Sequence, residues 1–235
     1  MIIKPIKTRI FREGDDLFAF VTSYFKKLPE KSVVAVTSKI VALAERRTAV
    51  AKCSKAKERL IRRESEYAIS TKYVWLTIKD GMLMASAGID ESNADGRLIL
   101  LPKDSFKEAK ILREKLRQKY RVQELGVIIT DSRTLPLRAG VVGVALGYAG
   151  FRGVKDYRNT PDIFGRKFQY SRTDVADSLA TAAVLVMGEG REQQPLAIIE
   201  KTPIEFCDKI HRKELHIDIK DDMYGPLFPI FPKHR

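Results

Sequence analysis

The segment LGVIIT, residues 125–130, places apolar side chains on both faces of the strand that it predicts. A strand that faces water on one side alternates between apolar and polar residues, so this run indicates a buried strand. The strand ends at Asp131, and Arg133, Arg138 and Gly140 follow closely. A chain with this segment must therefore fold so that one carboxylate and two guanidinium groups stand where a buried strand ends.

Other segments predict the elements around this strand. Residues 32–44 read as a strand through Val36 that turns into a helix near Ser38, because β-branched residues give way to Ala, Leu and Glu. Residues 54–70 predict a basic amphipathic helix. The apolar runs before and after Asp80-Gly81 predict a hairpin, since Asp-Gly readily takes the positive φ values that such a turn needs. Residues 89–96 are polar and predict a loop.

Two longer helices and a last strand complete the expected fold. Ser105 and Glu108 form a capping-box pattern for a helix to about Tyr120, and the segment TDVADSLATAAVLVMGEG predicts a second helix that ends at Gly188 or Gly190. The apolar positions that we expect to be buried in these helices are Phe106, Ala109, Leu112, Leu116, Val175, Leu179 and Val186. Residues 195–200 predict a strand. Strands and helices do not alternate strictly, which favours an α+β fold with mixed, largely antiparallel sheets and packed helices.

Charge narrows the partners that the chain can bind. The formal net charge is +13, and residues 45–72 and 103–121 together supply ten of these charges. Such a surface attracts polyanions, nucleotide phosphates or multiply charged small substrates. The alternative, that these are solvated helix faces, stays open.

Several kinds of site have no support in the sequence. It has no P-loop pattern and no G-x-G-x-x-G pattern, and its three histidines all follow residue 210. Cys53 and Cys207 are far apart, which argues against a zinc or redox motif and predicts a reducing compartment, the cytoplasm. The longest nearly apolar run has thirteen residues, so we expect no signal peptide and no membrane segment.

Acids and arginines are the remaining candidates for chemistry. Asp131 is a candidate ligand for Mg²⁺ or Mn²⁺, and Arg133 and Arg138 are candidates for neutralising phosphate or a substrate carboxylate. The alternative is an acid that caps a turn and pairs with Arg133. A second group, Ser171, Thr173, Asp174 and Asp177, stands at the predicted start of a helix, where anions bind well. The same residues also fit an ordinary N-cap.

The chain resembles the coenzyme F420-0:L-glutamate ligase family, and most of all its bacterial branch of folate-metabolism γ-glutamate ligases. Seven blocks carry the resemblance in the same order, over about residues 33–200: TSKIVALAE, SAGIDESN, LLPKD, IITDS with PLRAG, GVALGYAGF, PDIFGR and AAVLVMGEG. The resemblance implies a metal-requiring, GTP-dependent, homodimeric enzyme of α+β fold. Such an enzyme joins L-glutamate through an amide bond to an acceptor that is F420-0-like or folate-like.

The resemblance also implies roles for particular residues. Two divalent metal sites fall on Asp131 and, near the YSRTD block, on Asp174 or Asp177. Our own hypothesis adds Arg133 and Arg138 as the catalytic residues that would steady phosphate or the incoming carboxylate. The implied nucleotide-binding residues are Thr37, Ser38, Lys39, Arg46, Ser132 and Thr134, and those of the substrate pocket are Asp90, Ser92 and Asn93. Many family members read IVSKAEGR where this chain reads IVALAERR, so a lysine of the family is replaced by Leu43 and a glycine by Arg46.

The domain organisation that we expect is a single ligase domain, 1–200, and a C-terminal extension, 201–235. The extension holds Tyr224, Leu227, Phe228, Ile230 and Phe231 and would cover its own subunit or a partner. Two alternatives in function remain. One is a basic nucleic-acid-binding protein that uses residues 59–63 and 107–119, although these stretches lack a base-stacking platform and we expect no nucleic acid partner. The other is a family member that binds nucleotide or deazaflavin without catalysis.

Overall fold

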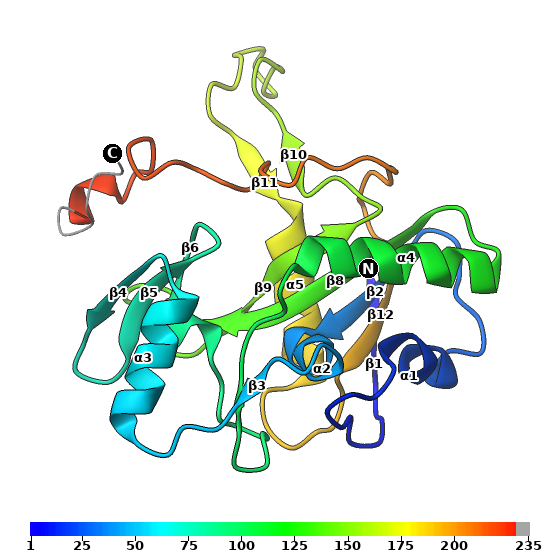
Figure 1. The fold of residues 1–235 in the computed structure, drawn as a ribbon. Helices are drawn as coiled ribbons and strands as arrows, with labels where there is room; N and C mark the ends of the chain where they lie inside the picture. Colours follow the sequence, from blue (N-terminus) through cyan, green and yellow to red (C-terminus); the bar gives the residue numbers. More distant parts are fainter. Residues whose placement is uncertain (229–235) are drawn as a thin grey trace.

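The computed structural model describes residues 1–228 and has at its centre a five-stranded sheet, with the strand order β1-β12-β2-β8-β9 (Figure 1). The strands are β1 (Ile2–Ile6), β2 (Ser32–Thr37), β8 (Leu125–Arg133), β9 (Val142–Ala149) and β12 (Leu196–Glu200). β2 and β8 pair in parallel, whereas the other neighbours in this sheet are antiparallel. The expected α+β class with mixed, largely antiparallel sheets is confirmed.

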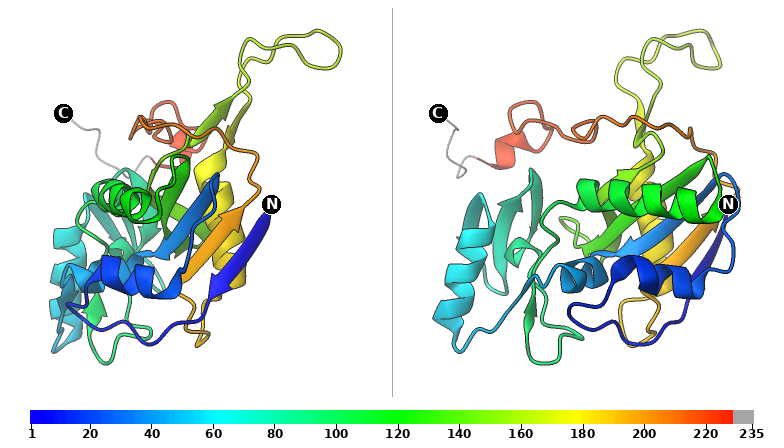
Figure 2. Two further views of the ribbon diagram at one scale, coloured as in Figure 1. Left: turned by 90° about the vertical axis from the view of Figure 1, so that its right-hand side faces the viewer. Right: turned by 45° about the vertical axis from the view of Figure 1, so that its right-hand side comes forward.

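Helices cover both faces of this sheet (Figure 2). They are α1 (Leu17–Tyr24), α2 (Ser38–Ala44) and α4 (Ser105–Tyr120) on one face and α5 (Val175–Met187) on the other. Val127 and Ile129 of β8 pack toward the first group, and Ile128 packs toward α5. Fully burying each such side chain contributes about 1.5–3 kcal/mol, which explains why both faces of this strand are apolar.

A smaller lobe lies beside the main sheet and holds a three-stranded sheet of order β4-β5-β6 (Figure 1). Its elements are α3 (Ser54–Glu64), β4 (Tyr67–Ser70), β5 (Trp75–Lys79), β6 (Met82–Ala85) and η1 (Ser86–Gly88), and the short pair β3 (Thr48–Ala49) and β7 (Leu98–Ile99) adjoins it. The helix predicted over 54–70 was wrong after Glu64, because the residues Tyr67–Ser70 pair with β5 instead. The predicted hairpin is confirmed, and Asp80 and Gly81 have φ of 52° and 71°.

The strand-to-helix turn at Ser38 is confirmed, and so are α4, α5 and β12. The start of α4 differs from the predicted capping box, because the carboxylate of Asp104 accepts from the Lys107 N–H and Asp104 is the N-cap. In α5 the N-cap is Asp174 and the helix ends at Gly188. Val186 is 38% exposed and does not belong to the buried face of this helix.

Two segments lie outside the layers of the body, one projecting from it and one running across it (Figure 1). Residues 154–174, here called the arm, begin and end with the paired strands β10 (Val154–Asp156) and β11 (Arg172–Asp174). Residues 202–216, here called the strap, follow β12 and cross the body, and η2 (Gly225–Leu227) lies farther along the chain. Ile230 and Phe231 of the predicted apolar tail lie outside the described residues. Within residues 1–228, no helix combines the length and apolar character needed to cross a membrane.

Candidate active site

The parallel pairing of β2 with β8 determines where the candidate site lies. Thr37, the last residue of β2, pairs with Thr130 of β8, and β8 continues past the predicted strand end at Asp131 to Arg133. The residue that follows each of these partners is a predicted site residue, and the Ser38 hydroxyl donates a hydrogen bond of 3.0 Å to Asp131 Oδ1. The topology of the sheet thus brings together two residues that are 93 positions apart.

Asp131 is partly buried and is held by its neighbours. A register shift between Ile129 and Thr130 precedes it, and it pairs with Val144 of β9. Burial raises the pKa of Asp131 to about 6, against the hydrogen bonds from Ser38 and from the Ser132 backbone; the charges of Asp90 and Glu189 raise it further. A carboxylate with a raised pKa beside two other acids is a position that a bound cation would stabilise.

Lys39, Asp90 and Ser92 form a second predicted group beside Ser38. Lys39 Nζ lies 2.8 Å from Asp90 Oδ2 and donates to the backbone oxygen and hydroxyl of Ser92 at 2.8 and 3.2 Å. Burial alone would raise the pKa of Asp90, but the hydrogen bonds from Lys39 and Ser92 outweigh it and lower that pKa. Asp90 therefore stays ionised, and the loop is fixed on the first turn of α2.

The same loop meets the segment that follows α5. Asn93 Nδ2 donates to the Gly190 backbone oxygen at 3.1 Å, which brings the predicted substrate residue Asn93 to the segment with Glu189. Glu189 was not predicted, although its charge reaches Asp131. The only signal in the sequence was an acid between two glycines after a helix stop.

Arg133 lies two residues beyond Asp131 and is partly buried. Its Nη2 lies 3.0 Å from Met82 Sδ of the smaller lobe. Burial lowers the pKa of Arg133, and the charges of Asp177 and Asp131 oppose that change. Within residues 1–228 no carboxylate lies within ion-pair distance of this guanidinium, so it is available to an anion. Arg138 lies in the exposed loop after β8.

Asp174 and Asp177 lie one strand away from Asp131. Asp177 Oδ1 accepts from the Ala145 N–H at 2.8 Å, and Ala145 is next to Val144, the partner of Asp131 in the ladder. Asp174 is exposed at the start of α5 and accepts from the Asp177 N–H at 2.9 Å. Although the residue is exposed, the protein around its carboxyl group removes part of its water, and this and the nearby charge of Asp177 raise the pKa of Asp174. The predicted N-cap and the predicted acid cluster are thus the same residues.

The donor set around Asp131 fits a divalent cation that also binds a substrate. No group of three or more His, Cys, Asp or Glu side chains in the part of the chain described here forms a complete metal site. Mg²⁺ is usually bound by one or two carboxylates together with phosphate oxygens and water, so an incomplete protein shell is expected. The buried Thr130 Oγ1, in the residue before Asp131, has no hydrogen-bond partner among residues 1–228.

The remaining residues predicted to bind nucleotide differ in their position relative to Asp131 and in their exposure. Thr37 is the N-cap of α2, and Ser132 is partly buried beside Asp131, whereas Thr134 is exposed. Arg46 lies at the other end of α2, where its guanidinium borders Gly14. Its φ of 56° is left-handed, a conformation that favours glycine, the residue that the family resemblance gives at this position. Leu43 packs against the core.

The basic residues that could bind nucleic acid lie on α3 and α4. On α3, Arg62 lies over the Trp75 ring at 4.5 Å, and on α4, Lys115 and Lys119 lie 5.6 and 6.0 Å from the Phe18 ring centroid. These rings are therefore already covered by cations.

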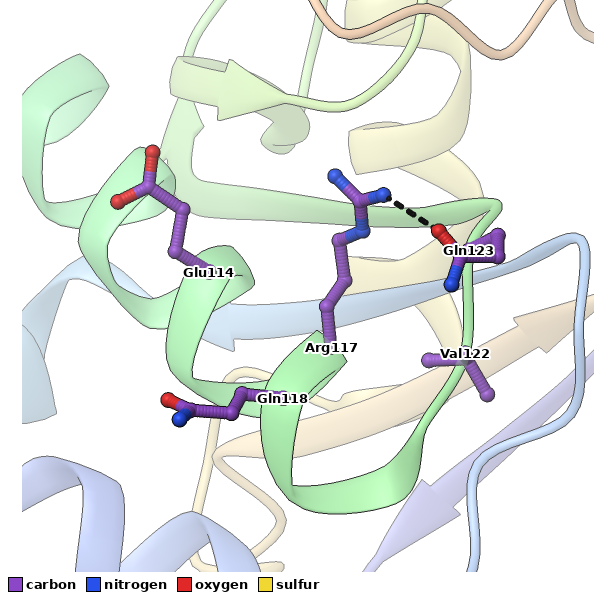
Figure 3. Close-up of a pocket in the computed structure, with 5 residues that line it drawn as sticks. All are labelled: Glu114, Arg117, Gln118, Val122 and Gln123. Carbon is purple, nitrogen blue, oxygen red and sulfur yellow. Dashed lines mark hydrogen bonds between the residues drawn. The ribbon is translucent and has the colours of Figure 1, made fainter.

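Two surface hollows lie where β8 begins, at the other end of the strand from Asp131. One, of about 240 Å³, is lined by Glu114, Arg117, Gln118, Val122 and Gln123 (Figure 3). There Arg117 Nη2 donates to Gln123 Oε1 at 3.1 Å. The other, of about 630 Å³, lies between the start of β2 and the residues after β12. Neither hollow includes a predicted site residue.

Known proteins resemble the chain over most of its length. The model of the F420-0:gamma-glutamyl ligase family matches residues 5–201. A coenzyme F420:L-glutamate ligase of Methanopyrus kandleri is 34% identical over 213 residues, which is 83% of each chain. One of Archaeoglobus fulgidus is 29% identical over 87% of this chain and 90% of its own.

A third relative matches a shorter and more similar region. The coenzyme F420:L-glutamate ligase of Methanothermobacter thermautotrophicus is 45% identical over 127 residues, 53% of this chain and 50% of its own. The match with several relatives thus spans little more than half of their length.

Proposed function

This chain belongs to the F420-0:gamma-glutamyl ligase family, and from that premise we propose that it joins L-glutamate through an amide bond to a carboxylate-bearing acceptor. The relatives named above are coenzyme F420:L-glutamate ligases. The acceptor that we propose is an F420-0-like or a folate-like molecule, and the co-substrate is a nucleoside triphosphate, GTP.

The proposed reaction has two steps, because a carboxylate is a poor acylating agent. In the first, an oxygen of the acceptor carboxylate attacks the terminal phosphorus of GTP, the bond between that phosphorus and the bridging oxygen breaks, and GDP leaves as the acyl phosphate forms. In the second, the amine of glutamate attacks the acyl carbon, loses a proton and displaces inorganic phosphate. Both steps gather negative charge at one centre, and fixed positive groups aimed at that centre lower the barrier.

The described contacts support particular roles. Ser38 and Lys39 would bind the phosphates, with Thr37, Ser132 and Thr134 beside them and Arg46 farther along α2. Asp131, with Asp174 or Asp177, would hold one or two Mg²⁺ or Mn²⁺ ions, which when bound neutralise phosphate charge.

Arginine and the polar loop would bind the reacting carboxylates. Arg133 has no carboxylate partner among residues 1–228 and can form bidentate bonds to a phosphate or a carboxylate. Arg138, in the exposed loop, can approach from solvent. Asp90, Ser92 and Asn93 would shape the acceptor pocket, because Lys39 holds their loop against α2.

One observation carries this proposal. The hydrogen bond between Ser38 and Asp131 lies beside the ion pair between Lys39 and Asp90. Three distant stretches of the chain therefore present a hydroxyl, an ammonium group and two carboxylates together. This is a combination suited to a triphosphate and its divalent cation.

The test of this function is direct. Purified protein is incubated with Mg²⁺ or Mn²⁺, L-glutamate and GTP or ATP, and with either F420-0 or tetrahydrofolate as acceptor. Mass spectrometry should show an acceptor that has gained one or more glutamyl units, and nucleoside diphosphate should form in step with it. No increment with either acceptor, together with no glutamate-dependent nucleotide hydrolysis, would contradict a ligase and support binding without catalysis.

We further propose a cytoplasmic homodimer. Cys53 and Cys207 are free thiols, which suits a reducing compartment.

The dimer contact that we propose is the tip of the arm. The arm exposes Ile163, Phe164 and Tyr170 by 92%, 88% and 85%. A two-stranded arm with an apolar tip is marginal on its own in water, so we assign this tip to the dimer contact.

A further inference from the structure

We propose that the strap is a positioning element of the ligase site, and that Glu214 within it holds the first turn of α5, with Asp174 and Asp177, in place. The role of these two aspartates rests on the proposed function. The match to the family model ends at residue 201, so the strap lies beyond the matched part of the chain. Its side chains nevertheless contact the elements around the site.

Glu214 reaches the end of β9 and the base of the arm. Its Oε1 accepts hydrogen bonds from the Tyr148 hydroxyl and, at 2.7 Å, from the Gly153 N–H. The Tyr148 ring is fully buried. Burial and then Glu214 raise the pKa of Tyr148, so its phenol remains a donor at neutral pH. The Glu214 carboxylate therefore accepts from two donors that keep their protons at neutral pH, and both are far from it in sequence.

Gly153 connects Glu214 to α5, because its backbone also bonds to the start of that helix. Its carbonyl oxygen accepts from the N–H groups of Val175 and Ala176, at 2.8 and 3.1 Å. A Cβ at Gly153 would lie 2.0 Å from the Tyr148 oxygen and 2.8 Å from Glu214 Oε1, so only glycine fits between them. One glycine thus bonds the strap through its N–H and the first turn of α5 through its C=O.

The first turn of α5 carries the two acids of the site. Asp174 accepts from the Asp177 N–H, and Asp177 in turn accepts from Ala145 of β9. The direction of this turn determines where both carboxylates point. Releasing Glu214 removes one support of Gly153, so the start of α5 is held less firmly, although the bond to Ala145 and the pairing of β10 with β11 remain.

Other residues of the strap hold it across the body. Arg212 pairs with Asp104, the N-cap of α4, and lies 5.1 Å from the Phe106 ring centroid. Asp208 accepts from Arg113 and Arg117 at 2.7 and 3.0 Å. The strap is therefore attached to α4 independently of Glu214, and the loss of Glu214 should loosen α5 without releasing the strap.

The experiment compares Glu214→Ala with Glu214→Gln and with Glu205→Ala. Glu205 belongs to the same strap, its side chain is 65% exposed, and it pairs with the exposed Arg152, which makes it the matched control. Three quantities are measured for each full-length variant: hydrogen exchange over 174–180, Tm, and the Kd of Mn²⁺ by electron paramagnetic resonance in the presence of GTP.

In Glu214→Ala we expect exchange in the first turn of α5 to become at least tenfold faster and the Kd of Mn²⁺ to rise several-fold. Glu214→Gln should recover most of the protection, because its amide oxygen can still accept both bonds, and Glu205→Ala should match the wild type. Should Glu214→Ala fail to fold, Tyr148→Phe removes one of the two bonds and should give a smaller increase in exchange and in Kd.

Unchanged exchange over 174–180, or an equal change in Glu205→Ala, would overturn the proposal. An unchanged Kd of Mn²⁺ beside faster exchange would also overturn it, since the strap would then stabilise α5 without positioning the acids. These measurements need no acceptor. A wild-type protein without ligase activity would instead overturn the proposed function.

Discussion

The hydroxyl of Ser38 donates a hydrogen bond to the carboxylate of Asp131, and so connects the end of β2 to its parallel neighbour β8. Ser38 directly follows β2, and Asp131 directly follows the buried part of β8, so neither backbone can shift without disturbing the core. The candidate site is therefore built on two buried, directly paired strands.

The change Asp131→Asn should abolish ligase activity and leave the fold intact. The amide has the shape of the carboxylate and still accepts from Ser38, but it lacks the charge that would bind a cation. We expect turnover to fall by roughly 10²–10³, as for the loss of other groups that stabilise transition-state charge. Product formation and thermal unfolding measure the two effects. Asp95→Asn, in the exposed loop, is the control, and wild-type turnover in Asp131→Asn would contradict the metal role.

The same variant should show how Asp131 affects stability as the pH changes. The pKa of Asp131 is raised from 3.8 to about 6 in the folded protein, so the folded state binds the proton more tightly than the unfolded state. The resulting stabilisation is complete below pH 3.8 and is lost as the pH rises through about 6. Without metal, Asp131→Asn should therefore gain stability relative to the wild type across this range, by up to about 3 kcal/mol.

Urea denaturation of both proteins in EDTA, from pH 4 to pH 8, measures this difference. The gap between the two free energies of unfolding isolates Asp131 from other groups that titrate. A gap that stays constant over this range would show that the carboxylate is not buried as the structure describes.

Lys39→Met should weaken nucleotide binding. The change removes the ammonium group proposed to bind phosphate and leaves Asp90 without its 2.8 Å partner. Loss of a charge-assisted hydrogen bond costs about 1.5–3 kcal/mol, which predicts a KM for GTP that is at least tenfold higher. Steady-state kinetics measure it, with Lys107→Met on the exposed face of α4 as the control. An unchanged KM would exclude Lys39 from the nucleotide site.

Gly147→Ala should destabilise the fold. A Cβ at this position would lie 2.4 Å from the Ser105 carbonyl carbon and 2.5 Å from the Phe106 nitrogen, both of which are backbone atoms at the start of α4. Overpacking of this kind costs about 1–3 kcal/mol. Gly140→Ala is the comparison, because nothing lies within 4 Å of its Cβ and its cost comes from φ alone. Equal or larger losses of unfolding free energy for Gly140→Ala would contradict the close contact.

The double change Ile163→Asp and Phe164→Asp should convert the proposed dimer into a monomer. Both side chains are almost fully exposed at the tip of the arm, so charges there cost the isolated subunit little. Light scattering after size-exclusion chromatography measures the mass. Ile10→Asp, at another exposed apolar position, should leave the mass unchanged. A variant that keeps the mass of the wild type would place the dimer contact elsewhere, and a wild-type monomer would refute the dimer.

Local signals in the sequence were enough for much of the fold. Asp80-Gly81 predicted the hairpin between β5 and β6, and the change from β-branched residues to Ala and Leu predicted the turn at Ser38. The signals failed where pairing with another strand overrode a helical pattern. The residues Tyr67–Ser70 continue a helical pattern in sequence, but they pair with β5 and form a strand.

Some residues of the candidate site could be predicted from local sequence, and others could not. Ser38, Lys39, Asp90 and Asp131 were predicted through short blocks, and the structure brings them together. Glu189 and Glu214 were missed, because each acts on a residue more than fifty positions away and neither belongs to a recognisable block. Side chains whose importance comes from long-range contact leave no periodicity or spacing that a single sequence can reveal.

The parallel pairing of β2 and β8 also has a consequence for folding. The hairpins and helices of this chain can form from neighbouring residues, but the two strands must close a loop of about ninety residues before Ser38 meets Asp131. A partly folded chain that already has most of its helices would thus be unable to bind a nucleotide. Ligand affinity during refolding should then appear in the slowest kinetic phase, when the two halves of the chain dock.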